Sequence, residues 1–226
     1  MPSAGRHLPP LDQAALQTLE VAPASLTVYR TGYLPPRSVP DPFYTQPSTN
    51  RFGTPAGTIY TASSATIAWA ETCRNVWAEI EDSNPLGVTN ASLAEIAAFG
   101  ATRINRLVPA RAVFELELEL KRVVDLRAAD AQEALERAGV PPADLHADDY
   151  GRCSELAQAA VSLGWEAIIV PSAAWDATDG FCLPVFKPTA AGVVTRVDLI
   201  EAAALPTVAV AHLTHYPDGR RPSWLP

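Results

Sequence analysis

The clearest hydrophobic pattern in the chain is an alternation over residues 114–120. Phe114 and three leucines alternate there with three glutamates. A period of two is expected of a β-strand that packs one face against a core and leaves the other in water. The pattern therefore predicts a strand with one wet face.

Shorter apolar runs predict the rest of a sheet. They are SLTVYRTG at 25–32, GTIYTA at 57–62, WEAIIVPS at 165–172, FCLPVF at 181–186, VVTRVDL at 193–199 and TVAVAHL at 207–213. The run at 165–172 is apolar through its centre, which favours a buried strand with Ser172 at its exit. Pro184 cannot donate to a ladder, so we expect its strand to lie at an edge or to contain a bulge.

Three helices are predicted between these strands. ADAQEALERAG indicates a helix that ends at Gly139, and SELAQAAVSLG indicates one that ends at Gly164. The third begins near Ala65, where Ser63 or Ser64 can cap its first turn. Helices of this length fit between the strands of a single layered domain.

The third helix has one apolar stripe when its positions are plotted at about 100° per residue. The stripe consists of Trp69, Cys73, Val76, Trp77 and Ile80. Glu71 points away from this stripe, onto a face of mostly small residues. Such a face could line a cleft.

Prolines mark the segments outside the sheet. Residues 1–24 have a Pro-rich start and one short helical candidate, so we expect an N-terminal arm rather than a core element. Residues 33–50 hold five prolines in eighteen positions, which predicts an extended loop. The elements together predict an α+β fold, a single domain with a central mixed or antiparallel sheet and flanking helices.

Composition and charge narrow the class of protein. With 226 residues, of which 48% are hydrophobic, the chain can bury one full core. A net charge of −8 would repel a phosphate backbone, so we expect no direct binding of nucleic acid. Three cysteines without a CxxC pair indicate a reducing, cytoplasmic setting. No stretch approaches the roughly 18 apolar residues of a membrane span, and we expect neither a membrane nor a metal site.

Arg30, Arg51, Tyr60 and Glu71 are the candidates for chemistry. An arginine midway along an apolar strand, such as Arg30, needs a buried anion or a ligand. The four side chains converge only if their strands are adjacent. Each also has a structural interpretation: a solvated helix residue for Glu71, a loop anchor for Arg51 and a core aromatic for Tyr60.

Suppose that these side chains meet a nucleotide whose ribose carries nicotinamide. The pyridinium leaves as a neutral molecule without a general acid, so one carboxylate is enough, whereas ordinary glycosidases use two. Glu71 would stabilise the oxocarbenium-like transition state, and arginine forks would hold the pyrophosphate or ribose. Tyr60 could stack on the nicotinamide ring or donate its hydroxyl group.

The segments YR at 29–30, RFGTPAGTIYTASSATIAWAE at 51–71 and PS at 171–172 resemble the RES domain family. The family is named for its Arg, Glu and Ser, and the resemblance implies a fold similar to that of ADP-ribosyltransferases. Matched motif by motif, the family residues fall on Arg30, Arg51, Tyr60, Glu71 and Ser172. Ser172 would hydrogen-bond the nucleotide; its structural alternative is a turn cap.

The resemblance also implies an activity. Family members are toxins of type II toxin–antitoxin systems that deplete NAD by hydrolysis or phosphorolysis, so NAD is expected as substrate and no cofactor is required. An Xre-type antitoxin is the expected partner, an immunity protein is the alternative, and a homodimer is an assembly to test. The RES-type domain would span residues 25–226, with insertions near 79–112 and 127–150 that contact a partner.

Two other functions remain open at this point. One is transfer of ADP-ribose to a macromolecule, which would leave the label on protein rather than on a free product. The other is a catalytically silent domain that binds a nucleotide or a partner. The segment PSAAWDATDGFCLPVF favours the second, because it lacks the arginine and asparagine that relatives often place there.

Overall fold

The computed structural model of the chain describes residues 9–33, 50–68, 70–72, 111–145, 150–173, 180–186 and 191–199. Its strands are β1 (Ala22–Tyr33), β2 (Thr58–Ala62), β3 (Arg111–Asp125), β4 (Ala167–Pro171), β5 (Phe181–Phe186) and β6 (Ala191–Leu199). Each matches a segment predicted as a strand. Four predicted features lie outside the described residues: the loop at 33–50 except for its two end residues, the apolar stripe that begins at Trp69, most of the insertion at 79–112 and the run at 207–213.

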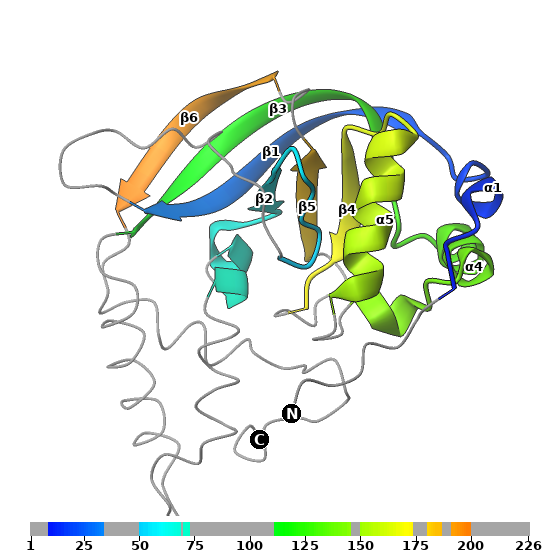
Figure 1. Cartoon of the computed structure of the whole chain (residues 1–226). Coiled ribbons are helices and arrows are strands. Elements are labelled where there is room, and N and C mark those ends of the chain that lie inside the picture. The colour runs from blue at the N-terminus through cyan, green and yellow to red at the C-terminus, as the bar shows by residue number, and fades with distance from the viewer. Residues whose placement is uncertain are drawn as a thin grey trace, which may run out of the picture.

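The strands form one mixed sheet in the order β1-β2-β5-β4-β3-β6. β3 and β4 run parallel, whereas the other paired strands are antiparallel. Because β1 also pairs with β3, five strands close into a ring and β6 extends from it. In Figure 1 the long, curved β1, β3 and β6 arch over the shorter β2, β5 and β4. The predicted α+β fold with a mixed sheet and flanking helices is confirmed.

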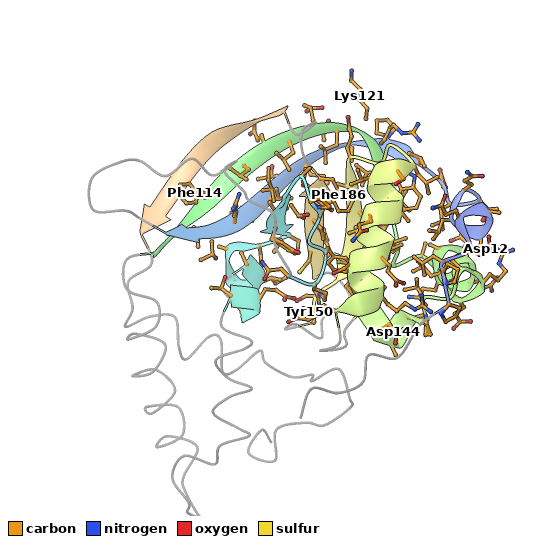
Figure 2. The ribbon with its side chains drawn as sticks, viewed as in Figure 1. Asp12, Phe114, Lys121, Asp144, Tyr150 and Phe186 are labelled. Carbon is orange, nitrogen blue, oxygen red and sulfur yellow. The ribbon has the colours of Figure 1, made fainter. Side chains whose placement is uncertain are left out.

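The two faces of the ring carry two separate apolar clusters. Among the described residues, the inner cluster draws buried side chains from all five strands of the ring and none from a helix, and Val28 and Phe114 are members. The outer cluster joins the other face of the strands to the helices, with Phe186 among its members. Phe186 shares the outer cluster with buried residues of α5 (Gly151–Ser162), and in Figure 2 Phe114 lies to the left of that helix. This division follows from the period of two, since neighbouring residues of a strand face opposite ways.

Two strand predictions can be checked on these clusters. In β4, Ile169 belongs to the inner cluster, while Ile168 and Val170 belong to the outer one. The strand is therefore buried on both faces, as predicted. In β3, Glu117 and Glu119 are exposed, so the wet face is confirmed as well.

Two of the predicted helices end at glycines as expected. α4 (Ala129–Ala138) is followed by Gly139, whose φ of 88° is left-handed and suits glycine at a helix C-terminus. α5 starts three residues before the predicted Ser154 and ends just before Gly164, which also has a positive φ of 73°. Between them lies a short 3₁₀ helix, η1 (Pro142–Leu145). No helix in the described part of the chain is long and apolar enough to cross a bilayer.

Pro184 lies in an internal strand, so the prediction of an edge or a bulge is wrong. β5 is flanked by β2 and β4, and its register with each neighbour stays constant. Toward β4, pairing occurs at Val185 and Cys182 but not at the two positions between them. Backbone pairing with β4 is therefore interrupted at Pro184, which has no N–H to donate. The missing donor is accommodated without a bulge.

The N-terminal segment is part of the core, which differs from the predicted arm. Helix α1 (Gln13–Leu16) is capped by Asp12, and the backbone N–H of Asp12 donates to Ala138 O in α4 at 3.1 Å. Leu16 is fully buried in the outer cluster, and Leu19 is nearly so. The prolines before this helix indicated a break in structure, yet the apolar residues in and after the helix pack in the same cluster as those of α4.

Truncating Leu16 tests this placement. We expect Leu16→Ala to destabilise the fold by about 3 kcal/mol, because it removes a fully buried side chain. The exposed neighbour Gln17→Ala is the matched control and should change stability by less than about 0.5 kcal/mol. Urea unfolding followed by circular dichroism measures both; equal midpoints for the two variants would show that this segment is outside the core.

Candidate functional site

The short helix that carries Glu71 packs on the outer face of the sheet. Its described helical residues are 65–68 and 70–72, which we call the Glu71 helix. The hydroxyl oxygen of Ser64 accepts a hydrogen bond from the Ile67 N–H at 3.2 Å, so the predicted cap is confirmed. Ile67 and Ala70 are buried, and the side chain of Glu71 is 21% exposed. The carboxylate is therefore near the surface but largely withdrawn from water.

One oxygen of the Glu71 carboxylate accepts three hydrogen bonds. Oε1 receives them from Ser172 Oγ at 2.7 Å, the Ala173 N–H at 2.8 Å and Cys182 Sγ at 3.3 Å. Ser172 and Ala173 follow directly after β4, and Cys182 lies in the adjacent β5. Residues more than a hundred positions apart in sequence thus meet at one atom.

The other oxygen of Glu71 faces an arginine. Arg51 Nη2 is 3.9 Å from Glu71 Oε2, and the Arg51 side chain is only 9% exposed. Arg51 begins the turn that leads into β2, and its guanidinium lies 5.1 Å from the ring centre of Phe52. A cation over an aromatic face is favourable, and Phe52 is itself fully buried.

The turn at residues 50–57 is held in place by hydroxyl groups. Tyr60 Oη accepts from the Phe52 N–H at 2.8 Å, and Thr58 Oγ1 donates to Phe52 O at 2.8 Å. Thr54 Oγ1 donates to the carbonyl of Gly57, whose φ of 91° closes the turn. The backbone that carries Arg51 is therefore fixed by β2, the same strand that precedes the Glu71 helix.

Burial and charge act together on Arg51. Burial by itself lowers the pKa of Arg51, but the negative charge of Glu71, helped by smaller contributions, outweighs it and raises the pKa overall. The guanidinium stays charged. Its Nη1 is buried and has no hydrogen-bond partner among the described residues. A buried donor without an acceptor is costly and marks a place where a ligand would fit.

The thiol of Cys182 is kept protonated by its surroundings. Burial, the negative charge of Glu71 and the hydrogen bond to Glu71 raise the pKa of Cys182 well above its ordinary value. The nearby Arg51 charge and a contact with Ser172 oppose this shift without reversing it. At neutral pH the sulfur therefore carries its proton and acts as a donor.

Arg30 lies on a different face from the other four sequence-predicted residues. β1 and β2 are adjacent and pair at Tyr29 and Ala62. The strands that carry Arg30 and Tyr60 are therefore neighbours, as convergence of the side chains requires. Tyr29 packs against the outer cluster together with Tyr60, whereas Val28 belongs to the inner cluster. By strand alternation, Arg30 shares the inner face with Val28.

Two contributors to the site were not anticipated from the sequence. They are the Ala173 N–H and Cys182. A backbone donor carries no sequence signal. The alternation in FCLPVF does place Cys182 on one face with Pro184 and Phe186, but only the pairing of β5 with β2 brings that face to Glu71.

Comparisons with known proteins place this architecture in context. A chain of the crystal structure of the M. tuberculosis MbcT–MbcA toxin–antitoxin complex has the same fold, with a TM-score of 0.58 and 17% sequence identity. The match covers 88% of this chain and 96% of that one. A search of curated proteins found no match.

The RES domain family matches residues 27–206, a span that includes all five sequence-predicted site residues and both β4 and β5. The match covers most of the chain and the whole of the ring except the start of β1. On this ground, and with the shared fold beside it, the chain belongs to the RES domain family.

Proposed function

We propose that this protein is a toxin that depletes NAD by breaking the bond between nicotinamide and ribose. The observation that carries the proposal is the anchored carboxylate, with Glu71 Oε1 held by three donors and Oε2 turned toward Arg51. Membership of the RES domain family supports the proposal, and so does the fold shared with a chain of a toxin–antitoxin complex.

One carboxylate is sufficient for this reaction. As the bond between ribose and nicotinamide breaks, its electron pair moves onto the ring nitrogen and neutralises the pyridinium. Positive charge then develops on the sugar, and a fixed carboxylate stabilises it in a site where water is scarce. Because Oε1 is engaged by the protein, we assign Oε2 to the ribose. Water or phosphate then adds to the sugar carbon; hydrolysis and phosphorolysis share this first step.

Arg51 is proposed to hold the anionic part of the substrate. The chain has a net charge of −8, so a dinucleotide needs a local cation to enter. Arg51 is charged and buried, and its Nη1 has no hydrogen-bond acceptor in the part of the chain that the structure describes. A guanidinium offers paired donors to phosphate oxygens, which suits this task.

The remaining candidates have supporting roles in this proposal. Ser172 orients Glu71 directly. Tyr60 fixes the turn of Arg51 through Phe52 and is half-buried, so its ring can contact the nicotinamide. Arg30 is also proposed to contact the substrate, although it lies on the inner face, three residues before the end of β1, and Arg30→Ala should raise KM for NAD.

An antitoxin protein is the proposed partner, of Xre type or acting as an immunity protein. The proposed site of action is the cytoplasm, where NAD is available. The structure of the MbcT–MbcA toxin–antitoxin complex supports a protein partner for this fold.

Replacing Glu71 tests the proposed chemistry. We expect Glu71→Gln to lower the rate of nicotinamide release from NAD by at least about 100-fold, equal to about 2.7 kcal/mol of barrier. The neutral amide cannot stabilise the positive charge that develops on the ribose. The matched control is Glu117→Gln, an exposed glutamate on β3, which should keep full activity. A loss of less than about tenfold for Glu71→Gln would contradict the assigned role.

Replacing Arg51 tests anion binding. Arg51→Lys keeps a charge but loses the planar fork, so KM for NAD should rise about tenfold or more. Arg127→Lys is the control, because Arg127 also pairs with a carboxylate, Asp125, and lies 4.8 Å from the ring centre of Phe181. Steady-state kinetics decide: a KM for Arg51→Lys equal to that of Arg127→Lys would reject the role.

Toxicity should follow the chemistry. Cells that make the protein alone should stop growing as their NAD falls, and Glu71→Gln should relieve the arrest. Plating efficiency and extracted NAD are the readouts, at protein levels matched by immunoblot. Robust growth at high levels of the unaltered protein with normal NAD would count against a toxin.

A further inference from the structure

We propose that Cys182 is a positioning residue for Glu71. Its thiol shares with Ser172 and Ala173 the task of holding Oε1, so that the carboxylate meets the ribose through Oε2 in one fixed orientation. This inference rests on the proposed function and adds to it a residue that the family motif does not include.

The geometry of the three donors supports this role. Cys182 Sγ lies 3.3 Å from Glu71 Oε1, within reach of a hydrogen bond from sulfur. The cysteine is in an internal strand, where it pairs with Ala62 of β2 on one side and with Val170 of β4 on the other. Its backbone is therefore fixed by two ladders. A donor on such a rigid element can orient a side chain that comes from a short helix.

The protonation state of the thiol agrees with this role. Burial and the negative charge of Glu71 raise the pKa of Cys182 well above its ordinary value, so the sulfur carries a proton to donate. Only 6% of the residue is exposed. A protonated, buried thiol is a poor nucleophile, which argues that the sulfur serves the carboxylate rather than attacking substrate.

Holding one oxygen matters for the chemistry of the other. A carboxylate can rotate about its last carbon–carbon bond and exchange its two oxygens. Three donors that converge on Oε1 oppose this rotation. A thiol is a weak donor by itself, but a charged acceptor strengthens the bond.

Cys153 provides a matched control for a purely structural thiol. It is fully buried, and its sulfur is 3.2 Å from an acceptor, the backbone carbonyl of Asp144. It therefore shares burial and hydrogen bonding with Cys182 but has a neutral backbone acceptor. Substitutions at the two positions separate loss of packing from loss of the bond to Glu71.

The first test is kinetic. We expect Cys182→Ala to lower kcat for nicotinamide release by about tenfold with KM within about twofold, because the bond to a charged group is lost. Cys182→Ser supplies a hydroxyl donor and should stay within about threefold of the unaltered kcat. Cys153→Ala should leave kcat within about twofold even if it lowers the melting temperature.

The second test does not depend on turnover. The infrared S–H stretching band of Cys182 is isolated as the difference between the unaltered protein and Cys182→Ser. A carboxylate acceptor draws this band to lower frequency, so Glu71→Gln should shift it upward, because a neutral amide accepts more weakly. The Cys153 band, isolated in the same way, should not move.

Several outcomes would overturn the inference. One is a kcat for folded Cys182→Ala within about twofold of the unaltered protein. Another is a kcat for Cys182→Ser as low as that for Cys182→Ala. A third is an S–H stretching band of Cys182 whose frequency is the same with and without Glu71→Gln. If the unaltered protein releases no nicotinamide, the proposed function fails, and the infrared shift alone still decides whether Cys182 holds Glu71.

Discussion

The carboxylate of Glu71 is the group on which the rest of the site depends. Its side chain is only 21% exposed, so the charge has lost most of its water and must be stabilised by protein donors. Ser172, Ala173 and Cys182 supply three hydrogen bonds to one oxygen, and the cation of Arg51 lies beside the other. A negative charge held by fixed donors needs no reorganisation when substrate binds. This preorganisation allows it to stabilise a developing positive charge.

The closed ring explains how such distant segments reach one another. β5 lies between β2 and β4, so the end of β2, the exit of β4 and the start of β5 share one outer surface. The Glu71 helix follows β2 directly and places its carboxylate over that surface. The same strand fixes the turn of Arg51 through Thr58 and Tyr60. A single short strand thus positions both charges of the site.

Local patterns in the sequence predicted the elements well. Alternation revealed β3 with its wet face, and glycines revealed the ends of α4 and α5. Ser63 or Ser64 was expected to cap the Glu71 helix, and Ser64 does so. These features depend on residues close together in the chain, where the period of two or 3.6 and the freedom of glycine act directly. The pairing of β1 with β2 could only be stated as a condition.

Features that depend on tertiary neighbours were not predictable in the same way. Pro184 was expected at an edge or a bulge, because the lack of an N–H follows from the residue itself. The gap in the pairing with β4 that accommodates it depends on a neighbouring strand and is not visible in the sequence. Leu16 is buried in the outer cluster, together with residues of α4 that lie more than a hundred positions away in sequence. The grouping of Arg30 with Tyr60 ignored alternation, which places Arg30 on the inner face with Val28. Cys182 carried no chemical motif at all, and its role emerges from the strand order.

The identity of the products tests the central claim most directly. Purified protein is incubated with NAD, and the products are identified by mass spectrometry. Cleavage at the sugar carbon that faces Glu71 predicts free nicotinamide together with ADP-ribose or its phosphate ester. Intact NAD, or the pair of AMP and nicotinamide mononucleotide from a broken pyrophosphate, would contradict the account.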